Sequence, residues 1–294
     1  MQVHRALARR CVNTSRSAIR RSARLLGGYI PLDLRQRLLL WANTRRLPGG
    51  FDMSMGLLDD LRRTDPDAFH RFLWSNHLAY AARYQVSRKF GRHNINPTRH
   101  LLFREMHAYF RARGIDPHHQ VRSVFEVGCS MGYLLRHVEE EVFPRAGVLH
   151  GLDIDRHAVE SGTAHLNDLD SRVRLHHGDL ENTARTMAGR KYDVVFCCGV
   201  LMYVNQKTAQ DVIRTMFRHA RWLVGMVCLA HPEGDRVPAG VSSARDSDGA
   251  YIHDVKHMIR DAGGRTVFSE WVGTRVSGSS PSHVILAEPS ENRV

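Results

Sequence analysis

Apolar and polar positions divide this chain into a helical first part and a second part in which strand-like and helical stretches alternate. Helical spacing is predicted over residues 33–46, where Leu34, Leu38 and Trp41 recur on one face. The Pro-Gly-Gly run at residues 48–50 is predicted to end this helix, because both residue types interrupt helical backbone.

Two further helices are predicted in the first part, beginning at an Asp-Pro pair (65–66) and an Asn-Pro pair (96–97). Asp and Asn are favoured N-cap residues, and Pro is favoured in the first helical turn. Residues 31–120 are therefore predicted to form a helical N-terminal segment. Residues 1–30, which contain seven Arg and no acidic residue, are predicted to be a basic, disordered tail.

The second part, residues 121–290, reads as strands alternating with helices, which predicts a doubly wound α/β sheet. Helices are expected over 206–220 and 251–262, and residues 231–250 are expected to form a loop. The last two strand-like runs are joined by a Gly/Ser-rich turn, so they are expected to close the sheet as an antiparallel hairpin. The strand-like runs are 121–127, 147–153, 173–180, 194–197, 222–229, 266–271 and 283–287.

The most informative stretch is VFEVGCSMGYLL at residues 124–135, where a strand ends at an acid and passes through a small-residue turn into a helix. The acid is Glu126, and the turn contains Gly128, Ser130 and Gly132. Glycine permits positive φ and a close approach of backbone to ligand. A strand, a glycine turn and a helix N-terminus together predict a small-molecule site.

The spacing argues against a dinucleotide. That fingerprint places glycines at offsets of roughly 0, 2 and 5, whereas the fifth position after Gly128 is Tyr133. Glu126 would also place a negative charge beside a pyrophosphate, which is unfavourable at short range. A ligand with a cationic end and no phosphate, such as S-adenosylmethionine, suits this turn better.

Two more acids follow at the ends of the next strand-like runs, Asp153 after GVLHGL and Asp179 after VRLHHG. An acid at the first of these positions can bind a ribose hydroxyl pair. Each acid could instead cap the helix that follows it. The conjunction of three acids at three successive strand ends favours a nucleoside-binding site.

Residues 121–204 resemble the cofactor half of class I S-adenosylmethionine-dependent methyltransferases, and the order of elements agrees over 121–290. The first motif of that family resembles E/D-x-G-x-G-x-G; Glu126, Gly128 and Gly132 match it, and Ser130 replaces the middle glycine. The resemblance implies a Rossmann-like, doubly wound seven-stranded sheet with an antiparallel last strand, and S-adenosyl-L-methionine as the cofactor.

The resemblance also implies roles for individual residues. Glu126 and Gly128 would lie by the methionine end, and Asp153 would hold the ribose. The turn after the fourth strand, GVLMYV, is similar to the G-V-L-x-H-x of many small-molecule methyltransferases, with Tyr203 in place of the His. The full set of implied cofactor-binding residues is Glu126, Gly128, Cys129, Ser130, Gly132, Asp153, Ile154, Asp179, Leu180, Cys198 and Gly199.

A hydroxyl acceptor would gain from a general base, and the candidates are Tyr203 and His231, each of which could equally be a wall of the pocket. A small organic acceptor, methylated on oxygen or nitrogen, is the first expectation, with a sugar or a natural-product intermediate as examples. The alternatives are an RNA- or protein-directed methyltransferase that uses the basic N-terminal segment, and a cofactor-binding protein without catalysis. The helical segment could cap the substrate, with contacts from Tyr80, Arg83 and Tyr84.

Charge is unevenly distributed. Residues 1–120 contain 22 basic and 8 acidic residues, whereas residues 121–294 contain 20 and 22. A basic block can attract nucleic acid, anionic lipid or an acidic substrate. An Arg bias throughout the chain also explains much of the excess, because only four of the 42 basic residues are Lys.

The remaining composition limits other classes. Five cysteines without C-x-x-C spacing argue against a disulfide framework and a zinc site. Of the nineteen histidines, the adjacent pairs His118–His119 and His176–His177 are interpreted as surface or loop residues, so no metal is expected. No apolar run is long enough for a transmembrane helix. A cytoplasmic location is expected; the Arg-rich, acid-free N-terminus leaves mitochondrial targeting as the alternative.

Overall fold

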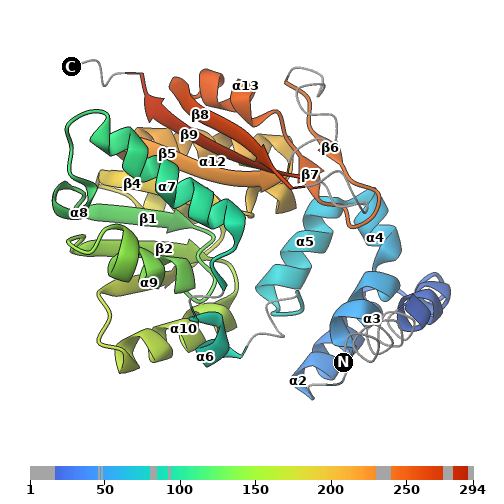
Figure 1. The fold of residues 1–294 in the computed structure, drawn as a ribbon. Coiled ribbons are helices and arrows are strands. Elements are labelled where there is room, and N and C mark those ends of the chain that lie inside the picture. The colour runs from blue at the N-terminus through green and yellow to red at the C-terminus, as the bar shows by residue number, and fades with distance from the viewer. Residues whose placement is uncertain are drawn as a thin grey trace, which may run out of the picture. The chain divides into compact units, whose positions relative to one another are not determined.

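The computed structural model describes residues 17–45, 47, 49–79, 85–91, 94–229, 240–273 and 281–290. The chain divides into two compact units. The first contains residues 1–83 together with Asp246–Gly249, and the second contains Tyr84–Arg245 and Ala250–Val294. Figure 1 shows the helices of the first unit in blue and the sheet of the second in green to red.

The first unit is helical. Its elements are residues 17–27, α2 (Leu32–Thr44), α3 (Gly50–Leu57), α4 (Asp59–Thr64) and α5 (Pro66–Ser75). Helix α5 has the predicted start, since the Asp65 carboxylate accepts a hydrogen bond from the Ala68 amide at 2.9 Å. The core of this unit is formed by the buried side chains Ala23, Leu39, Met55, Leu57, Leu58, Phe69, Leu73, Leu78 and Ala79.

Three expectations for the first unit need correction. Residues 17–27 are helical, although they lie in the segment expected to be a disordered tail. Helix α2 ends at Thr44, ahead of the Pro-Gly-Gly run, but Gly49 takes φ 82° as the N-cap of a new helix, α3, which begins at Gly50. The face of α2 that carries Leu34, Leu38 and Trp41 is exposed.

The orientation of α2 follows from Arg35, which is 5% exposed. Its guanidinium donates to the Leu57 carbonyl and pairs with the Asp60 carboxylate. The hydrogen bonds from Arg35 lower the pKa of Asp60. Leu39 and Ala42 are buried on the same side of the helix. Leu34, Leu38 and Trp41 each directly precede one of these inward-pointing residues, which places them about 100° further round the helix, on a face that points outward.

The tip of a hairpin from the second half of the chain belongs to the first unit. The Arg62 guanidinium donates to the Asp246 carbonyl, and a Cβ at Gly249 would lie 3.0 Å from the Arg62 side chain. Burial lowers the pKa of the neighbouring His70 to about 4, so this imidazole is neutral at physiological pH. Residues 246–249 are thus held by buried polar groups of α4 and α5.

The second unit contains a seven-stranded sheet in the order β3-β2-β1-β4-β5-β9-β8 within the described residues. The last strand in sequence, β9, pairs antiparallel to both of its neighbours, which confirms the predicted closing hairpin and the predicted fold class. The strands are β1 (Ser123–Val127), β2 (Val148–Asp153), β3 (Val173–His177), β4 (Tyr192–Cys198), β5 (Ala220–Leu229), β8 (Gly264–Val272) and β9 (Ser282–Pro289), with β6 (Ser243–Ala244) and β7 (Tyr251–Ile252) forming a separate pair.

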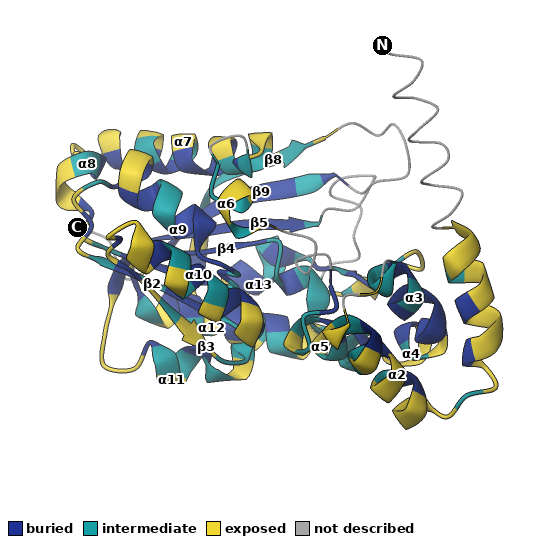
Figure 2. Ribbon diagram, turned by 90° about the horizontal axis from the view of Figure 1, so that it is seen from below, coloured by how far each residue is buried: buried dark blue, intermediate teal, exposed yellow. Residues whose placement is uncertain are grey.

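Helices cover both faces of this sheet, so its central strand β4 is buried throughout (Figure 2). One core joins the sheet to α7 (Pro97–Arg111) and α9 (Tyr133–His137), and the other joins it to α12 (Gln206–His219) and α13 (Val255–Asp261). The remaining helical elements are α6 (Val86–Lys89), α8 (Pro117–Gln120), η3 (Val138–Val142), α10 (Arg156–Asp168), η4 (Leu180–Asn182), α11 (Thr183–Thr186) and η5 (Leu201–Tyr203).

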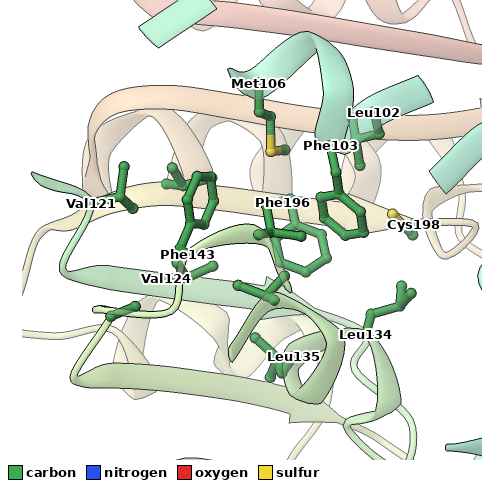
Figure 3. Close-up of a cluster of buried hydrophobic side chains, with 14 of the residues drawn as sticks. Leu102, Phe103, Met106, Val121, Val124, Leu134, Leu135, Phe143, Phe196 and Cys198 are labelled. Atoms are coloured by element: carbon green, nitrogen blue, oxygen red, sulfur yellow. The ribbon is translucent and has the colours of Figure 1, made fainter. Parts of the chain in front are cut away.

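Helix α7 belongs to the sheet unit, so the chain divides near residue 84 and not near residue 121 as expected. Figure 3 shows Leu102, Phe103 and Met106 of this helix packed over Val124 and Phe196 of the sheet. Burial of large apolar side chains stabilises such a contact by about 1.5–3 kcal/mol per residue. Removing the whole predicted N-terminal segment would therefore expose one face of the sheet.

A second difference concerns residues 251–262, which were expected to be one helix. Tyr251–Ile252 form strand β7, and helix α13 begins only at Val255. The Asp254 carboxylate caps α13 by accepting a hydrogen bond from the His257 amide at 3.1 Å. An N-cap residue has extended backbone, which separates the strand from the helix.

The Tyr109 hydroxyl fixes the C-terminal half of α7 to the last strand. It donates to the Glu288 carboxylate at 2.8 Å, and Arg113 donates to the same oxygen at 2.7 Å. Burial opposes ionisation of Glu288, but the hydrogen bonds from Tyr109 and Arg265 outweigh it and lower the pKa of this carboxyl.

Tyr109→Phe tests this connection. We expect a loss of about 1.5–3 kcal/mol in the free energy of unfolding, because a buried hydrogen bond to a charged acceptor is lost. Urea denaturation of the sheet unit measures it. Tyr29→Phe is the matched control, since Tyr29 is 90% exposed, and an equal effect in both variants would contradict the assignment.

Candidate functional site

The candidate site lies at the carboxyl ends of the central parallel strands. Strand β1 lies between β2 and β4, and the strand order reverses there along the chain. Doubly wound sheets bind ligands at this topological switch point, outside the carboxyl ends of the strands. Glu126 in β1, Asp153 at the end of β2 and Cys198 at the end of β4 therefore meet at one edge.

The turn from β1 into α9 uses left-handed backbone at three positions, with φ of 76° at Gly128, 50° at Ser130 and 80° at Gly132. A Cβ at Gly128 would lie 2.1 Å from a methyl group of Val200, so a side chain there would also collide with the turn after β4. Ser130 takes the left-handed conformation that the glycine of the family motif would adopt. A non-glycine residue in this conformation carries some backbone strain.

Asp153 holds this turn in place. Its carboxylate accepts one hydrogen bond from the Ser130 amide at 2.7 Å and another from the Asp155 amide at 2.9 Å. The alternative role as a helix cap belongs to Asp155, whose carboxylate accepts from the Ala158 amide at 3.0 Å. Each oxygen of Asp153 still has a second acceptor position, which a ligand hydroxyl can use.

Glu126 is the most unusual group of the site. It is 2% exposed, and its Oε2 atom has no hydrogen-bond partner among the residues that the structure describes. Burial, followed by the nearby Asp153, raises the pKa of Glu126 well above its ordinary value, while Arg99 acts in the opposite direction. A buried carboxylate oxygen without a hydrogen-bond partner lowers the stability of the folded protein. A ligand that offers a hydrogen-bond donor or a cation at this position would remove that cost.

Asp153 shares this environment, and burial raises its pKa to about 6. Two carboxylates in one buried region repel each other when both are ionised. A ligand with a positive charge would relieve that repulsion, whereas a pyrophosphate would increase it. The two carboxylates therefore disfavour a dinucleotide, as the spacing of the glycine turn does.

The third acid, Asp179, lies at the start of η4, and its side chain makes no capping hydrogen bond to that element. The end of β3 is joined to the end of β2 by a hydrogen bond from the Gly178 amide to the Asp153 carbonyl at 2.9 Å. Leu180, the next residue, packs partly against the core on the α12 side. Asp179 thus follows Asp153 along the same edge of the sheet.

The opposite side of the site is formed by the turn after β4. Gly199 takes φ 73°, and its amide donates to the Val227 carbonyl at 2.7 Å. Tyr203, one of the two candidate bases, lies half-buried in η5. The other candidate, His231, lies outside the described residues, as do Tyr80, Arg83 and Tyr84.

The cysteines near the site are packing residues. Cys129, Cys197 and Cys198 are buried, and burial raises the pKa of each thiol well above its ordinary value. They are therefore neutral, which leaves them without the thiolate that a nucleophile or metal ligand needs. The backbone of Cys129 lies in the glycine turn, and its side chain packs in the core.

Sequence reasoning missed two groups that shape the site. Arg99, near the start of α7, is close enough to affect the ionisation of both Glu126 and Cys198. His253 lies behind η5, where its Nε2 donates to the Leu201 carbonyl at 2.8 Å and its Nδ1 accepts from the Ser242 hydroxyl at 2.7 Å. Neither belongs to a recognisable motif, and only the fold brings them to this edge.

Comparison with known proteins identifies the domain. Residues 124–222 match the family model of a methyltransferase domain. The chain contains a methyltransferase domain. The prediction of a class I S-adenosylmethionine-dependent methyltransferase is confirmed at this level. No curated protein matches the chain in sequence.

Solved structures agree on the fold of the methyltransferase domain. Magnesium protoporphyrin IX methyltransferase from Synechocystis PCC 6803 with bound S-adenosylmethionine is 19% identical, with a TM-score of 0.51 over 77% of this chain and 98% of that chain. With the demethylated cofactor bound, the same enzyme matches over 100% of its length at the same identity. The N-methyltransferase NodS from Bradyrhizobium japonicum WM9 is 15% identical over 70% of this chain and 97% of that chain, with a TM-score of 0.46.

No helix among the described residues is long and apolar enough to cross a membrane. In the same residues, no group of three or more His, Cys, Asp or Glu side chains is placed to hold a metal ion.

Glu126→Gln tests whether ionisation of Glu126 destabilises the methyltransferase domain when no ligand is bound. Because the folded-state pKa is raised, ionising Glu126 destabilises the fold, and stability falls as the pH rises from the unfolded-state pKa through the raised one. We expect the variant to be more stable at neutral pH without ligand, by about 1–3 kcal/mol. Thermal unfolding across a pH series measures this.

The matched control is Glu160→Gln, an exposed acid on α10. We expect it to leave both the stability and its pH dependence unchanged. Equal behaviour of the two variants would show that Glu126 is not an unfavourable buried charge.

Proposed function

We propose that the chain transfers a methyl group from S-adenosyl-L-methionine to a small organic acceptor, on oxygen or nitrogen. The observation that supports this most is the pair of carboxylates at one edge of the sheet, the buried Glu126 and the half-buried Asp153, which favours a cationic nucleoside and disfavours a phosphate. The match to a methyltransferase domain supports methyl transfer as the reaction. The small organic acceptor is proposed in addition to what the family match gives.

Within this proposal each residue has a distinct task. Glu126 accepts hydrogen bonds from the ammonium end of the cofactor, and Asp153 accepts from its ribose hydroxyls. Asp179, with Ile154 and Leu180, surrounds the adenine. The backbone of the glycine turn (Gly128, Cys129, Ser130 and Gly132) and of Cys198 and Gly199 lines the remainder of the cofactor.

The cofactor supplies an activated methyl group on sulfur, which leaves alignment as the main task of the protein. Alignment alone can account for roughly 7–11 kcal/mol of barrier reduction. The close contact of Val200 with Gly128 fixes the acceptor-side turn against the cofactor-side turn. His253 holds η5 through the Leu201 carbonyl, and Tyr203 is two residues further along this element.

Binding specificity gives the first test of the proposal. We expect calorimetric titration to detect S-adenosylmethionine and its demethylated product, and not NAD. Asp153→Ala should weaken binding of both by about tenfold or more, because hydrogen bonds to a charged group are lost. Asp168→Ala, an exposed acid at the end of α10, is the control. Binding of NAD, or full affinity in Asp153→Ala, would refute the assignment.

Tyr203 provides a test of the acceptor side. In a screen of sugars, phenols and amines, we expect Tyr203→Phe to lower kcat for the best acceptor by about 10²–10⁴-fold if its hydroxyl takes the acceptor proton. Cofactor affinity should stay unchanged. An unaltered kcat would remove Tyr203 as the base, and transfer to RNA with steep salt dependence would instead favour the nucleic-acid alternative.

A further inference from the structure

Exposed apolar side chains are concentrated in one short stretch of the chain. Of the eleven large apolar residues that are exposed in the described part of the molecule, nine lie between residues 19 and 47. The other two, Leu169 and Val241, are isolated from each other in the sheet unit. Single exposed apolar residues are ordinary, whereas a group of them marks an interaction surface.

The outer stripe of α2, formed by Leu34, Leu38 and Trp41, is the best-defined part of this group. These side chains are 45%, 40% and 50% exposed, and the spacing of four and three residues places them in one row along the helix. A neighbouring face of the helix is already occupied by the contacts of Arg35. The outer stripe therefore cannot turn inward without breaking the Arg35–Asp60 pair.

Positive charge surrounds the outer stripe. Arg37 is exposed between Leu34 and Leu38, and the Arg45 guanidinium lies 4.7 Å from the ring centroid of Trp41. Across residues 1–47 the sequence contains eleven Arg and one acidic residue, Asp33. An apolar row bordered by arginines can place its apolar side chains among lipid tails and its cations among anionic headgroups.

The charge also distinguishes between possible occupants of the outer stripe. A second copy of this chain would bring a surface with the same excess of arginine, and like charges oppose such pairing. Nucleic acid would use the arginines but would leave the leucines and Trp41 exposed. Helix α2 has 13 residues, a length of roughly 20 Å that is too short to span a bilayer.

We propose that the outer stripe of α2 docks on the surface of an anionic lipid membrane. The apolar side chains insert at the level of the headgroups, and Arg37 and Arg45 contact lipid phosphates or carboxylates. This binding is peripheral and independent of the methyl-transfer reaction, so either property can be present without the other.

Co-sedimentation of the full-length protein with vesicles tests the proposal. Vesicles of phosphatidylcholine with phosphatidylserine are compared with phosphatidylcholine alone, at low and raised salt. We expect binding to the anionic vesicles that weakens as salt is added. Equal binding to both vesicle types, or none to either, would overturn the proposal.

Two pairs of variants locate the contact. The triple variant Leu34→Gln, Leu38→Gln, Trp41→Gln should lose about tenfold or more in vesicle affinity because apolar burial is removed. The double variant Leu169→Gln, Val241→Gln, at residues 41% and 50% exposed, should bind normally. Arg37→Glu with Arg45→Glu should likewise lose about tenfold or more, whereas Arg111→Glu with Arg218→Glu, exposed arginines on α7 and α12, should lose clearly less.

Circular dichroism and thermal unfolding confirm that each variant is folded, which is expected because the altered side chains are exposed. Equal losses in the two members of either pair would overturn the assignment to α2. Sedimentation velocity adds a further outcome: if the triple variant converts a dimer into a monomer without changing vesicle binding, the outer stripe is a contact between copies and the proposal is wrong.

Discussion

The meeting of two poorly solvated carboxylates at one edge of the sheet is the constraint on which the rest of the site depends. Glu126, near the end of β1, is buried, and Asp153, at the end of the adjacent parallel strand β2, is half-buried. The protein satisfies Asp153 with backbone amides of the glycine turn and leaves one oxygen of Glu126 unsatisfied. Poorly solvated carboxylates without a partner destabilise the unliganded protein, and a cationic ligand removes this cost when it binds.

The same edge depends on segments far away in sequence. Helix α7 covers the sheet and brings Arg99 toward Glu126, so part of the predicted N-terminal segment belongs to the site-bearing unit. The hairpin of β6 and β7 has two roles. His253, just after β7, holds the turn that carries Tyr203, while the hairpin tip, residues 246–249, is bound by Arg62 within the first unit.

The strands, their alternation with helices and the acids near the strand ends could be predicted because each depends on local pattern: alternating elements, turn residues and strand-end positions. The N-caps at Asp65 and Asn96 are local for the same reason. The orientation of α2 was not predictable, because the apolar row Leu34, Leu38 and Trp41 looked like a core face. An arginine paired with Asp60, an acid on another helix, decided which face is buried.

By itself, then, the sequence determined the fold class, the glycine turn and a preference for a nucleoside without phosphate, since these follow from spacing and charge within short segments. Only the tertiary structure decided that Asp153 supports the turn while Asp155 caps α10, that Ser130 replaces glycine in a left-handed position, and that Arg99 and His253 reach the site. Long-range packing makes these contacts, and a pattern read along the chain carries no information about which distant residues will meet.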